Sequence, residues 1–286
     1  MTRNRAHLST RVCVRAGAFA AAVAGALVLA GGASAVPRQE LAAPPAPASA
    51  MAPHGQYAGA AVSVPAYGTA EAGVACPSGT FPTGGGGRGS DGVFLIGSSP
   101  DSTTNPNRWT VRGHNRYSVS GTLSAFVVCT SSGSHTGGTI GGSVQPGSEG
   151  ATRDRCGSPT VATGVGWRSA PGMYISAAGV FGNRTAVEAN NEDTVSHDLF
   201  LTQMCAEGAH SQHTGSRVVL QQYQTATATV SCPAGEVPTG GGGVTGYRSY
   251  LVASAGTADG RGWEVRATNT TAYPRPVFAQ VICTRP

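Results

Sequence analysis

A cysteine-anchored stretch occurs three times in this chain of 286 residues and constrains its fold more than any other feature. Two copies are nearly identical: Cys76-Pro-Ser-Gly-Thr-Phe-Pro-Thr-Gly-Gly-Gly-Gly and Cys232-Pro-Ala-Gly-Glu-Val-Pro-Thr-Gly-Gly-Gly-Gly. The third, Cys156-Gly-Ser-Pro-Thr-Val-Ala-Thr-Gly-Val-Gly, is more divergent. In every copy a threonine lies seven residues after the cysteine, at Thr83, Thr163 and Thr239. Such regularity indicates three related structural units.

A second recurring segment follows each copy. Trp109-Thr-Val-Arg-Gly-His-Asn115 matches Trp263-Glu-Val-Arg-Ala-Thr-Asn269, and Thr185-Ala-Val-Glu-Ala-Asn-Asn191 keeps the valine and the final asparagine. Fourteen residues after each asparagine comes another cysteine, at Cys129, Cys205 and Cys283. For the recurring asparagines we expect a turn or a buried hydrogen-bonding role.

The N-terminal segment has the three parts of a secretory signal peptide. Four arginines precede an apolar run over residues 16–30, and Ala33-Ser34-Ala35 forms a cleavage site. We therefore expect residues 1–35 to be removed and the protein to be secreted and extracellular. No later apolar run approaches the ~20 residues that cross a bilayer, so we expect no membrane span.

Without residues 1–35 the formal charge falls from +5 to +1, and the remaining arginines are scattered. Binding to nucleic acid needs a clustered positive patch, so nucleic acid is not an expected partner. Residues 36–68 are rich in alanine and proline, which block helix and sheet. Two interpretations of this segment remain open: a disordered leader, or a flexible arm that gains order on a partner protein.

Six cysteines remain after cleavage, and an even number in an exported chain indicates three disulfides. The equivalent placement in each repeat favours one pairing within each repeat. Equal intervals of 27 residues from Cys129 to Cys156 and from Cys205 to Cys232 keep a pairing between repeats open. The pairing within repeats joins Cys76 to Cys129, Cys156 to Cys205 and Cys232 to Cys283.

The chain beyond residue 68 reads as all-β. Short β-prone runs are separated by Gly, Ser, Asn and Pro, and no sustained helical period occurs. Three units, at about 69–130, 149–206 and 225–286, predict a pseudo-threefold β-prism of three Greek-key-like sheets that bury a shared core. A β-trefoil also has three repeats, but these units are too long for its lobes.

The repeats resemble the vitelline membrane outer layer protein I family. The resemblance rests on the Cys-Pro-x-Gly start, the glycine pair about eight residues later, the later asparagine and the closing Val-x-Cys. It implies a threefold β-prism of Greek-key sheets. The units here are longer, and the Asp-Asp-Thr-x-x-Asn signature is absent; its nearest counterpart is Asn191-Glu-Asp-Thr194.

The chain also loosely resembles small secreted actinobacterial adaptors that join lectin subunits to a large repeat-containing toxin in umbrella-shaped particles. This resemblance rests on the export signal, the proline-rich leader and a compact disulfide-bonded domain. It implies an extracellular protein partner within a larger secreted assembly.

The residue types argue against catalysis. The chain contains no lysine, so the glycine runs at 84–87 and 240–243 cannot form a P-loop and are better explained by close strand packing. No serine-hydrolase elbow occurs, and the carboxylates do not recur at equivalent repeat positions. Only His210-Ser-Gln-His213 has ligand-like spacing, so we expect solvated loop histidines, no metal site and no cofactor. We expect that the protein is not an enzyme.

The candidate contact residues are Trp109 and Trp263, Arg112 and Arg266 three residues after them, and Tyr57 in the arm. The tryptophans could stack on a sugar, but they are also placed to fill the core. Because the middle repeat has Glu188 where the others have arginine, the three sheets should present unlike surfaces. The expected function is docking to another extracellular protein, partly through the arm. The alternative is a lectin-like module that binds a glycan or the cell envelope.

Overall fold

The computed structural model describes residues 54–101, 105–131, 135 and 137–286. The chain divides into two units, Met1–Pro47 and Ala48–Pro286, and the second unit contains all the described residues. The predicted signal peptide and residues 36–53 of the predicted arm lie outside the described residues.

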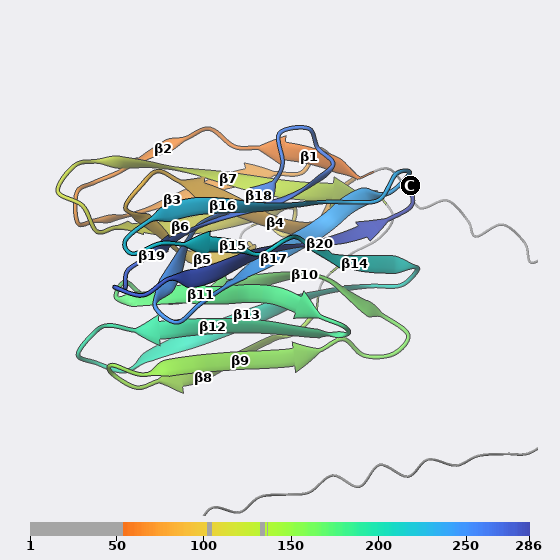
Figure 1. Ribbon diagram of the computed structural model, residues 1–286. Coiled ribbons are helices and arrows are strands. Elements are labelled where there is room, and N and C mark those ends of the chain that lie inside the picture. The colour runs from red at the N-terminus through yellow and green to blue at the C-terminus, as the bar shows by residue number, and fades with distance from the viewer. Residues whose placement is uncertain (1–53, 102–104, 132–134, 136) are drawn as a thin grey trace, which may run out of the picture. The chain divides into compact units, whose positions relative to one another are not determined.

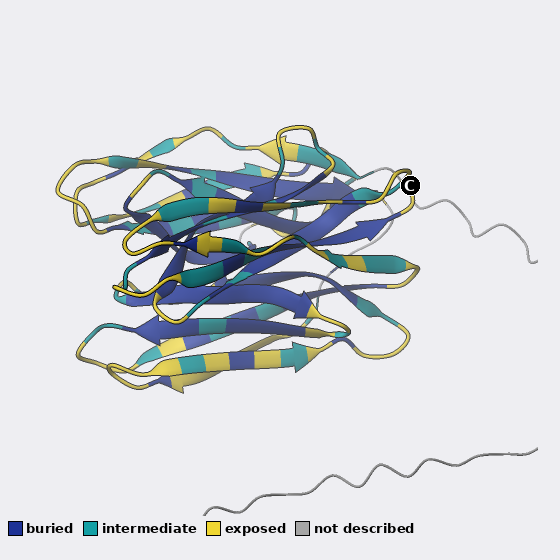
Figure 2. Ribbon diagram, viewed as in Figure 1, coloured by how far each residue is buried: buried dark blue, intermediate teal, exposed yellow. Residues whose placement is uncertain are grey.

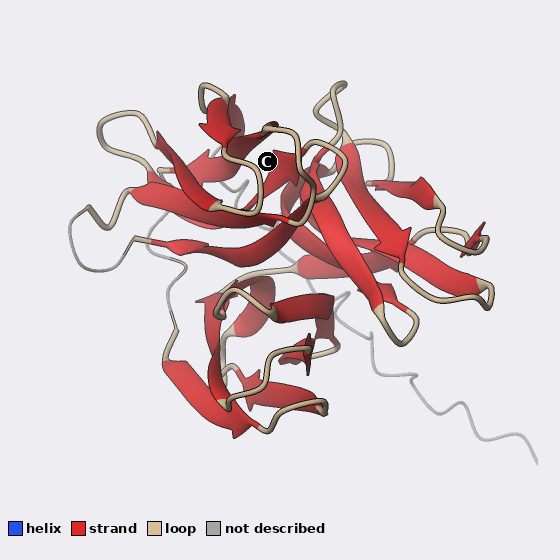
Figure 3. Ribbon diagram, turned by 90° about the vertical axis from the view of Figure 1, so that its left-hand side faces the viewer, coloured by secondary structure: helices blue, strands red, loops and turns tan. Residues whose placement is uncertain are grey.

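The described residues form twenty strands and no helix, which confirms the all-β prediction (Figure 3). The strands make three antiparallel sheets, as expected for a β-prism-like fold. We name them sheets A, B and C and give their strands in spatial order.

Sheet A contains strands of the first and third repeats. Its order is β1 (Gly55–Ala58), β7 (Gly121–Thr130), β4 (Phe81–Gly89), β18 (Ser249–Gly256), β19 (Gly262–Asn269) and β16 (Thr225–Ser231), with β2 (Val62–Val64) also paired to β7.

Sheet B contains strands of the first and second repeats. Its order is β3 (Thr69–Ala75), β6 (Arg108–Asn115), β5 (Val93–Pro100), β10 (Val161–Arg168), β13 (His197–Ala206) and β8 (Thr139–Val144).

Sheet C contains strands of the second and third repeats. Its order is β14 (His210–Thr214), β20 (Arg275–Thr284), β17 (Val237–Thr245), β11 (Met173–Phe181), β12 (Arg184–Asn191) and β9 (Glu149–Arg155), with β15 (Val218–Leu220) also paired to β20.

Every repeat is therefore divided between two sheets, which the sequence did not predict. In Figure 1 the orange and yellow strands β4 and β7 lie beside the blue strand β18. The repeats join along three short junctions, β4 with β18, β5 with β10 and β11 with β17. No repeat completes a sheet from its own strands.

The disulfides pair the cysteines within each repeat, as favoured by the sequence: Cys76–Cys129, Cys156–Cys205 and Cys232–Cys283. The first cysteine of each pair follows a strand in one sheet, and the second lies on a strand of the next. Each disulfide thus links two sheets through one repeat.

The recurring threonines meet at the centre of the fold. Each is the extra residue of a β-bulge at the start of β4, β10 or β17, and each is fully buried. The Thr83 hydroxyl donates to the Thr239 carbonyl oxygen at 2.6 Å, and the Thr239 hydroxyl lies 3.5 Å from the Thr163 carbonyl oxygen. The spacing of seven residues therefore marks the pseudo-threefold axis.

The glycines that follow these threonines have no room for side chains. A Cβ on Gly84 would lie 2.7 Å from the Cα of Gly240, and a Cβ on Gly240 would lie 3.3 Å from the Cα of Gly164. Backbone meets backbone at the axis, which confirms the close-packing interpretation of the glycine runs.

The interior between the sheets is filled by apolar side chains. The strand segments that carry buried residues are dark blue in Figure 2. Trp109 of β6 lies over Gly85 of β4, where a Cβ would come within 2.4 Å of the indole. Trp263 covers Gly241 in the same way. In the second repeat these two positions hold Thr185 and Val165, so a small residue replaces the tryptophan where a larger one replaces the glycine.

The recurring asparagines close one turn in each repeat, as expected, and all three are buried. The Asn191 amide nitrogen donates to the carbonyl oxygens of Val144 (2.9 Å) and Val195 (2.8 Å), and its oxygen accepts the Asp193 N–H (2.9 Å). Asn115 and Asn269 make the same kinds of bond.

The boundaries of the arm and of the repeats need correction. Residues 55–58 and 62–64, assigned to the flexible arm, form β1 and β2 and pair with β7. Strands β8, β14 and β15 take the same place in the later repeats. Each repeat therefore begins earlier than position 69, 149 or 225, because the exposed edge of its last strand needs a hydrogen-bonding partner.

The Trp–Gly pairs predict energetic coupling. Gly85→Val should destabilise the protein by about 1–3 kcal/mol through overpacking, and Trp109→Thr by about 3–5 kcal/mol through the cavity it leaves. Together they reproduce the pair found in the second repeat, so their combined loss should fall short of the sum by about 1–3 kcal/mol. Urea unfolding of the four proteins measures this coupling, and additive losses would contradict it.

The hydrogen bonds of the asparagine turns predict that Asn191 stabilises the fold more than its neighbour Asn190 does. Asn191→Ala should cost about 1–3 kcal/mol because it leaves buried backbone groups without partners. Asn190 is also buried, but its amide nitrogen has no hydrogen-bond partner among the described residues. Asn190→Ala is therefore the matched control and should cost less in chemical denaturation. Equal losses would show that burial, and not hydrogen bonding, matters here.

Candidate functional site

The two tryptophans proposed as sugar contacts are core residues. Trp109 and Trp263 are 0% exposed, and their indole N–H groups donate to Ser98 and Ser254, each at 2.9 Å. The sugar-stacking interpretation is wrong for both, because no ligand can reach a buried ring without opening the core.

The other three candidates lie on separate surfaces. Tyr57 belongs to strand β1, not to a flexible arm, and its ring covers Gly55 at the edge of sheet A. Arg266 lies on β19 of sheet A and forms an ion pair with Asp91. Arg112 lies on β6 of sheet B and lines a groove.

This groove crosses the outer face of sheet B where the first and second repeats join, and its volume is about 380 Å³. Six strands, β3, β5, β6, β8, β10 and β13, and the segment after β5 supply its polar lining. The groove is lined by Glu71, Gly97, Ser98, Ser99, Pro100, Asp101, Arg108, Thr110, Arg112, Thr139, Arg168 and Thr202. Its volume falls in the range of small-ligand sites.

Strand alternation and glycine together shape the groove. Arg108, Thr110 and Arg112 are partly exposed and alternate with buried neighbours on β6, so they share its outer face. The Arg108 guanidinium occupies the place of a side chain on Gly73. At Gly97 a Cβ would lie 3.4 Å from the Cβ of Arg112, so the missing side chain hollows the sheet.

The groove carries three guanidinium groups and two carboxylates. Arg108 lies 4.0 Å from Asp101, and Arg168 covers the Phe200 ring at 5.3 Å. Neither Arg112 nor Arg168 forms an ion pair within the described part of the chain. Guanidinium groups with free donors favour carboxylate, phosphate or sulfate groups.

The equivalent faces of sheets A and C differ, as the unlike repeat residues predict. On sheet A an ion pair between Arg88 and Glu264 (2.6 Å) spans the β4–β18 junction. On sheet C, Glu188 takes the place of Arg112 and pairs with Arg153 at 2.6 Å. Glycine at position 97 is alanine in both other repeats, at 177 and 253. Sheet C has a hollow of its own, of about 390 Å³, beside Arg153, Arg184 and Glu188. Sheet B differs in having a glycine at the junction and two arginines without ion pairs around it.

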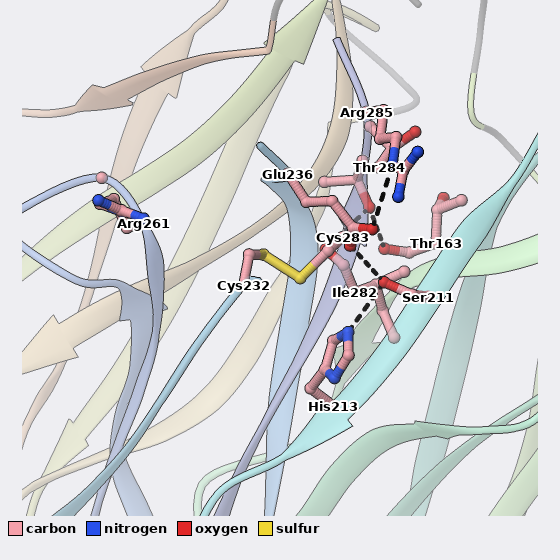
Figure 4. Close-up of a disulfide and its surroundings, with 12 residues drawn as sticks. Thr163, Ser211, His213, Cys232, Glu236, Arg261, Ile282, Cys283, Thr284 and Arg285 are labelled. Atoms are coloured by element: carbon pink, nitrogen blue, oxygen red, sulfur yellow. Dashed lines mark hydrogen bonds and ion pairs between the residues drawn. A yellow bond between two sulfur atoms is a disulfide. The ribbon is translucent and has the colours of Figure 1, made fainter. Parts of the chain in front are cut away.

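A second polar cluster lies beside the Cys232–Cys283 disulfide (Figure 4). The Ser211 hydroxyl donates to Glu236 at 2.6 Å, and it lies 2.9 Å from Nε2 of His213. In a serine-hydrolase triad the histidine accepts the serine proton and the acid orients the histidine. Here the Ser211 hydroxyl donates its hydrogen bond to the Glu236 carboxylate and not to His213, so the arrangement does not activate the serine.

Nor does this cluster provide a complete metal site. Ligand atoms of His213, Glu236 and Cys283 lie within 4.8 Å of one another, but the Cys283 sulfur belongs to the disulfide and cannot act as a thiolate. Two ligands remain, fewer than a protein zinc site needs. Glu236 also faces Arg285 at 3.7 Å.

An aromatic cluster occupies another part of the axis. Phe94, Tyr174 and Tyr250 hold corresponding positions in the three repeats, and their ring centroids are 5.2–5.9 Å apart. The Arg116 guanidinium lies 4.9 Å from the Tyr174 ring and pairs with Glu192 at 2.9 Å. Burial raises the pKa of both tyrosines. The protein's own arginine covers this cluster, so it does not offer a free cation site.

The sequence indicated Arg112 but not the groove around it, because Gly97 and Arg168 come from strands whose adjacency depends on how the repeats are joined.

Within the described residues no helix has the length and apolar character needed to span a membrane. No protein-family model matches the chain, and no curated protein sequence matches it.

Proposed function

We propose that this chain is a secreted, non-catalytic binding protein that docks to another extracellular protein through the groove of sheet B, as an adaptor or structural component. Three disulfides are typical of an oxidising environment, and the N-terminal sequence has the form of a secretory signal. The observation that carries the proposal is that two arginines without an ion pair among the described residues, Arg112 and Arg168, line one groove at the junction of the first two repeats.

The chemistry of the groove selects an acidic segment of the partner. Arg112 on β6 and Arg168 on β10 lie on either side of strand β5 in sheet B. Each guanidinium group can bind a carboxylate in a bidentate manner. The hydroxyl groups of Thr110, Thr139 and Thr202 add donors and acceptors around them. Arginines of this kind are common at the centre of protein interfaces.

A second candidate ligand is an anionic glycan of the cell envelope. The same hydroxyl and guanidinium groups fit an acidic polysaccharide, whereas the tryptophans expected to stack on a sugar are buried. Direct binding of acidic polysaccharide by the purified protein, lost with Arg112→Ala, would favour this candidate over a protein partner.

The groove predicts a specific loss of partner binding. We expect Arg112→Ala and Arg168→Ala to reduce the capture of secreted partner proteins from culture medium at least tenfold, about 1.4 kcal/mol per arginine, as for a charged interface residue. Arg266→Ala is the matched control, because it removes the arginine at the corresponding position of sheet A. Quantitative mass spectrometry after cross-linking measures the capture. Equal capture by all variants would exclude the groove as the docking site.

We expect the N-terminal arm to contribute to partner binding without contributing to the stability of the fold. Deletion of residues 36–53 spares β1 and should leave the thermal unfolding transition unchanged while weakening partner capture, because an arm that gains order on the partner adds contact area there. The same capture assay tests it, with the intact chain alongside. Unchanged capture would show that the arm is not part of the docking surface.

A further inference from the structure

Three histidines occupy corresponding places in the three repeats. His54 precedes β1 and His210 opens β14, and these strands pair with the ends of β7 and β20. The carbonyl oxygen of His135 accepts the backbone N–H of Cys205 at the end of β13, at 3.1 Å. Each histidine therefore lies beside the strand end that carries the second cysteine of its own repeat.

The pseudo-threefold arrangement brings the three rings together. The His135 ring centroid is 6.1 Å from that of His54 and 6.1 Å from that of His210, with both neighbours edge-on at 79° and 82°. His135 is 1% exposed. The expectation of solvated loop histidines is therefore wrong for this residue.

Hydrogen bonds fix the tautomer of two of these rings. Nδ1 of His135 lies 3.1 Å from the Thr163 hydroxyl, which donates its one proton to the Met204 carbonyl oxygen at 3.2 Å. With the hydroxyl proton directed at Met204, Nδ1 of His135 carries a proton and donates it to the Thr163 oxygen. Nδ1 of His210 lies 3.3 Å from the Gly208 carbonyl oxygen, which can only accept. In both rings the lone pair is thus on Nε2.

These two Nε2 atoms are buried and have no hydrogen-bond partner within the described part of the chain. Burial, and then the neighbouring histidines, lower the pKa of His135 to about 3, and burial lowers the pKa of His210. Buried imidazoles with unprotonated Nε2 and an Nδ1–H bound to an oxygen have the form of metal ligands held by outer hydrogen bonds.

We propose that His54, His135 and His210 form a binding site for a divalent transition-metal ion, with zinc as the expected occupant. Imidazole nitrogens suit zinc, and three protein ligands leave a fourth position for water or another donor. The ligand nitrogens do not all lie within 4.8 Å of one another, so binding requires the rings to turn about their side-chain torsions. The proposal does not depend on the docking function.

Such an ion would connect three parts of the chain that are far apart in sequence. His54 precedes β1, His135 lies between β7 and β8, and His210 opens β14. A bound ion would therefore link the starts of the three repeats to one another.

The test is zinc binding to the full chain carrying Cys13→Ser, so that no free thiol competes. Isothermal titration at pH 7 should give one zinc ion per chain, and His135→Gln and His210→Gln should each weaken binding at least tenfold. His213→Gln is the matched control: it lies on the same strand as His210, and its ring faces Ser211 and Glu236, so its affinity should change less than twofold. Circular dichroism confirms that each variant is folded.

Cobalt substitution gives a readout that does not rely on stability. We expect the visible absorption of nitrogen-coordinated cobalt in the parent chain and in His213→Gln, and its loss in His210→Gln, the edge-strand change that is easiest to accommodate. The proposal is overturned if the folded parent chain binds no zinc, or if the bound zinc is lost in His213→Gln and retained in His210→Gln.

Discussion

The contact of three β-bulges at the pseudo-threefold axis sets the limits for the rest of the structure. The hydroxyls of Thr83 and Thr239 reach the carbonyl oxygens of neighbouring bulges there, and the residues after the threonines approach backbone to backbone, so each of those positions is glycine. The three strands that begin at these bulges each belong to a different sheet. Close contacts at the axis thus hold the three sheets together. Each disulfide also links two of the sheets, farther from the axis.

A symmetric interior supports an asymmetric surface. The axis requires similar backbones in all three repeats, whereas outward-facing residues are free to differ. On sheet A an ion pair between Arg88 and Glu264 spans the junction, and on sheet C Glu188 is paired with Arg153 of the neighbouring strand. Sheet B has Gly97 and unpaired arginines instead. We attribute this difference to the docking function proposed for the groove.

The sequence predicted the features of the fold that depend on residues recurring in all three repeats. The all-β class and the three sheets follow from residues at fixed spacing, and the same spacing favoured the disulfide pairing within repeats without excluding a pairing between them. Two features did not follow. The sharing of each sheet by two repeats depends on strand adjacency, which spacing does not reveal. The edge strands β1 and β2 were assigned to the arm because proline precedes them, although Val64, Val144 and Leu220 all lie twelve residues before a first cysteine and are all buried. Trp109 and Trp263 show that an aromatic residue at the same position of two repeats is better explained by core packing than by ligand binding.

The three repeats should fold as one unit, because none of them completes a sheet alone. Native-state hydrogen exchange tests this most directly, by comparing the opening free energies of backbone amides in β4, β10 and β17. We expect all three strands to exchange with the same free energy, equal to that of global unfolding. A lower free energy for the strands of one repeat, with the other two still protected, would show that the repeats are separate folding units and would contradict this cooperative fold.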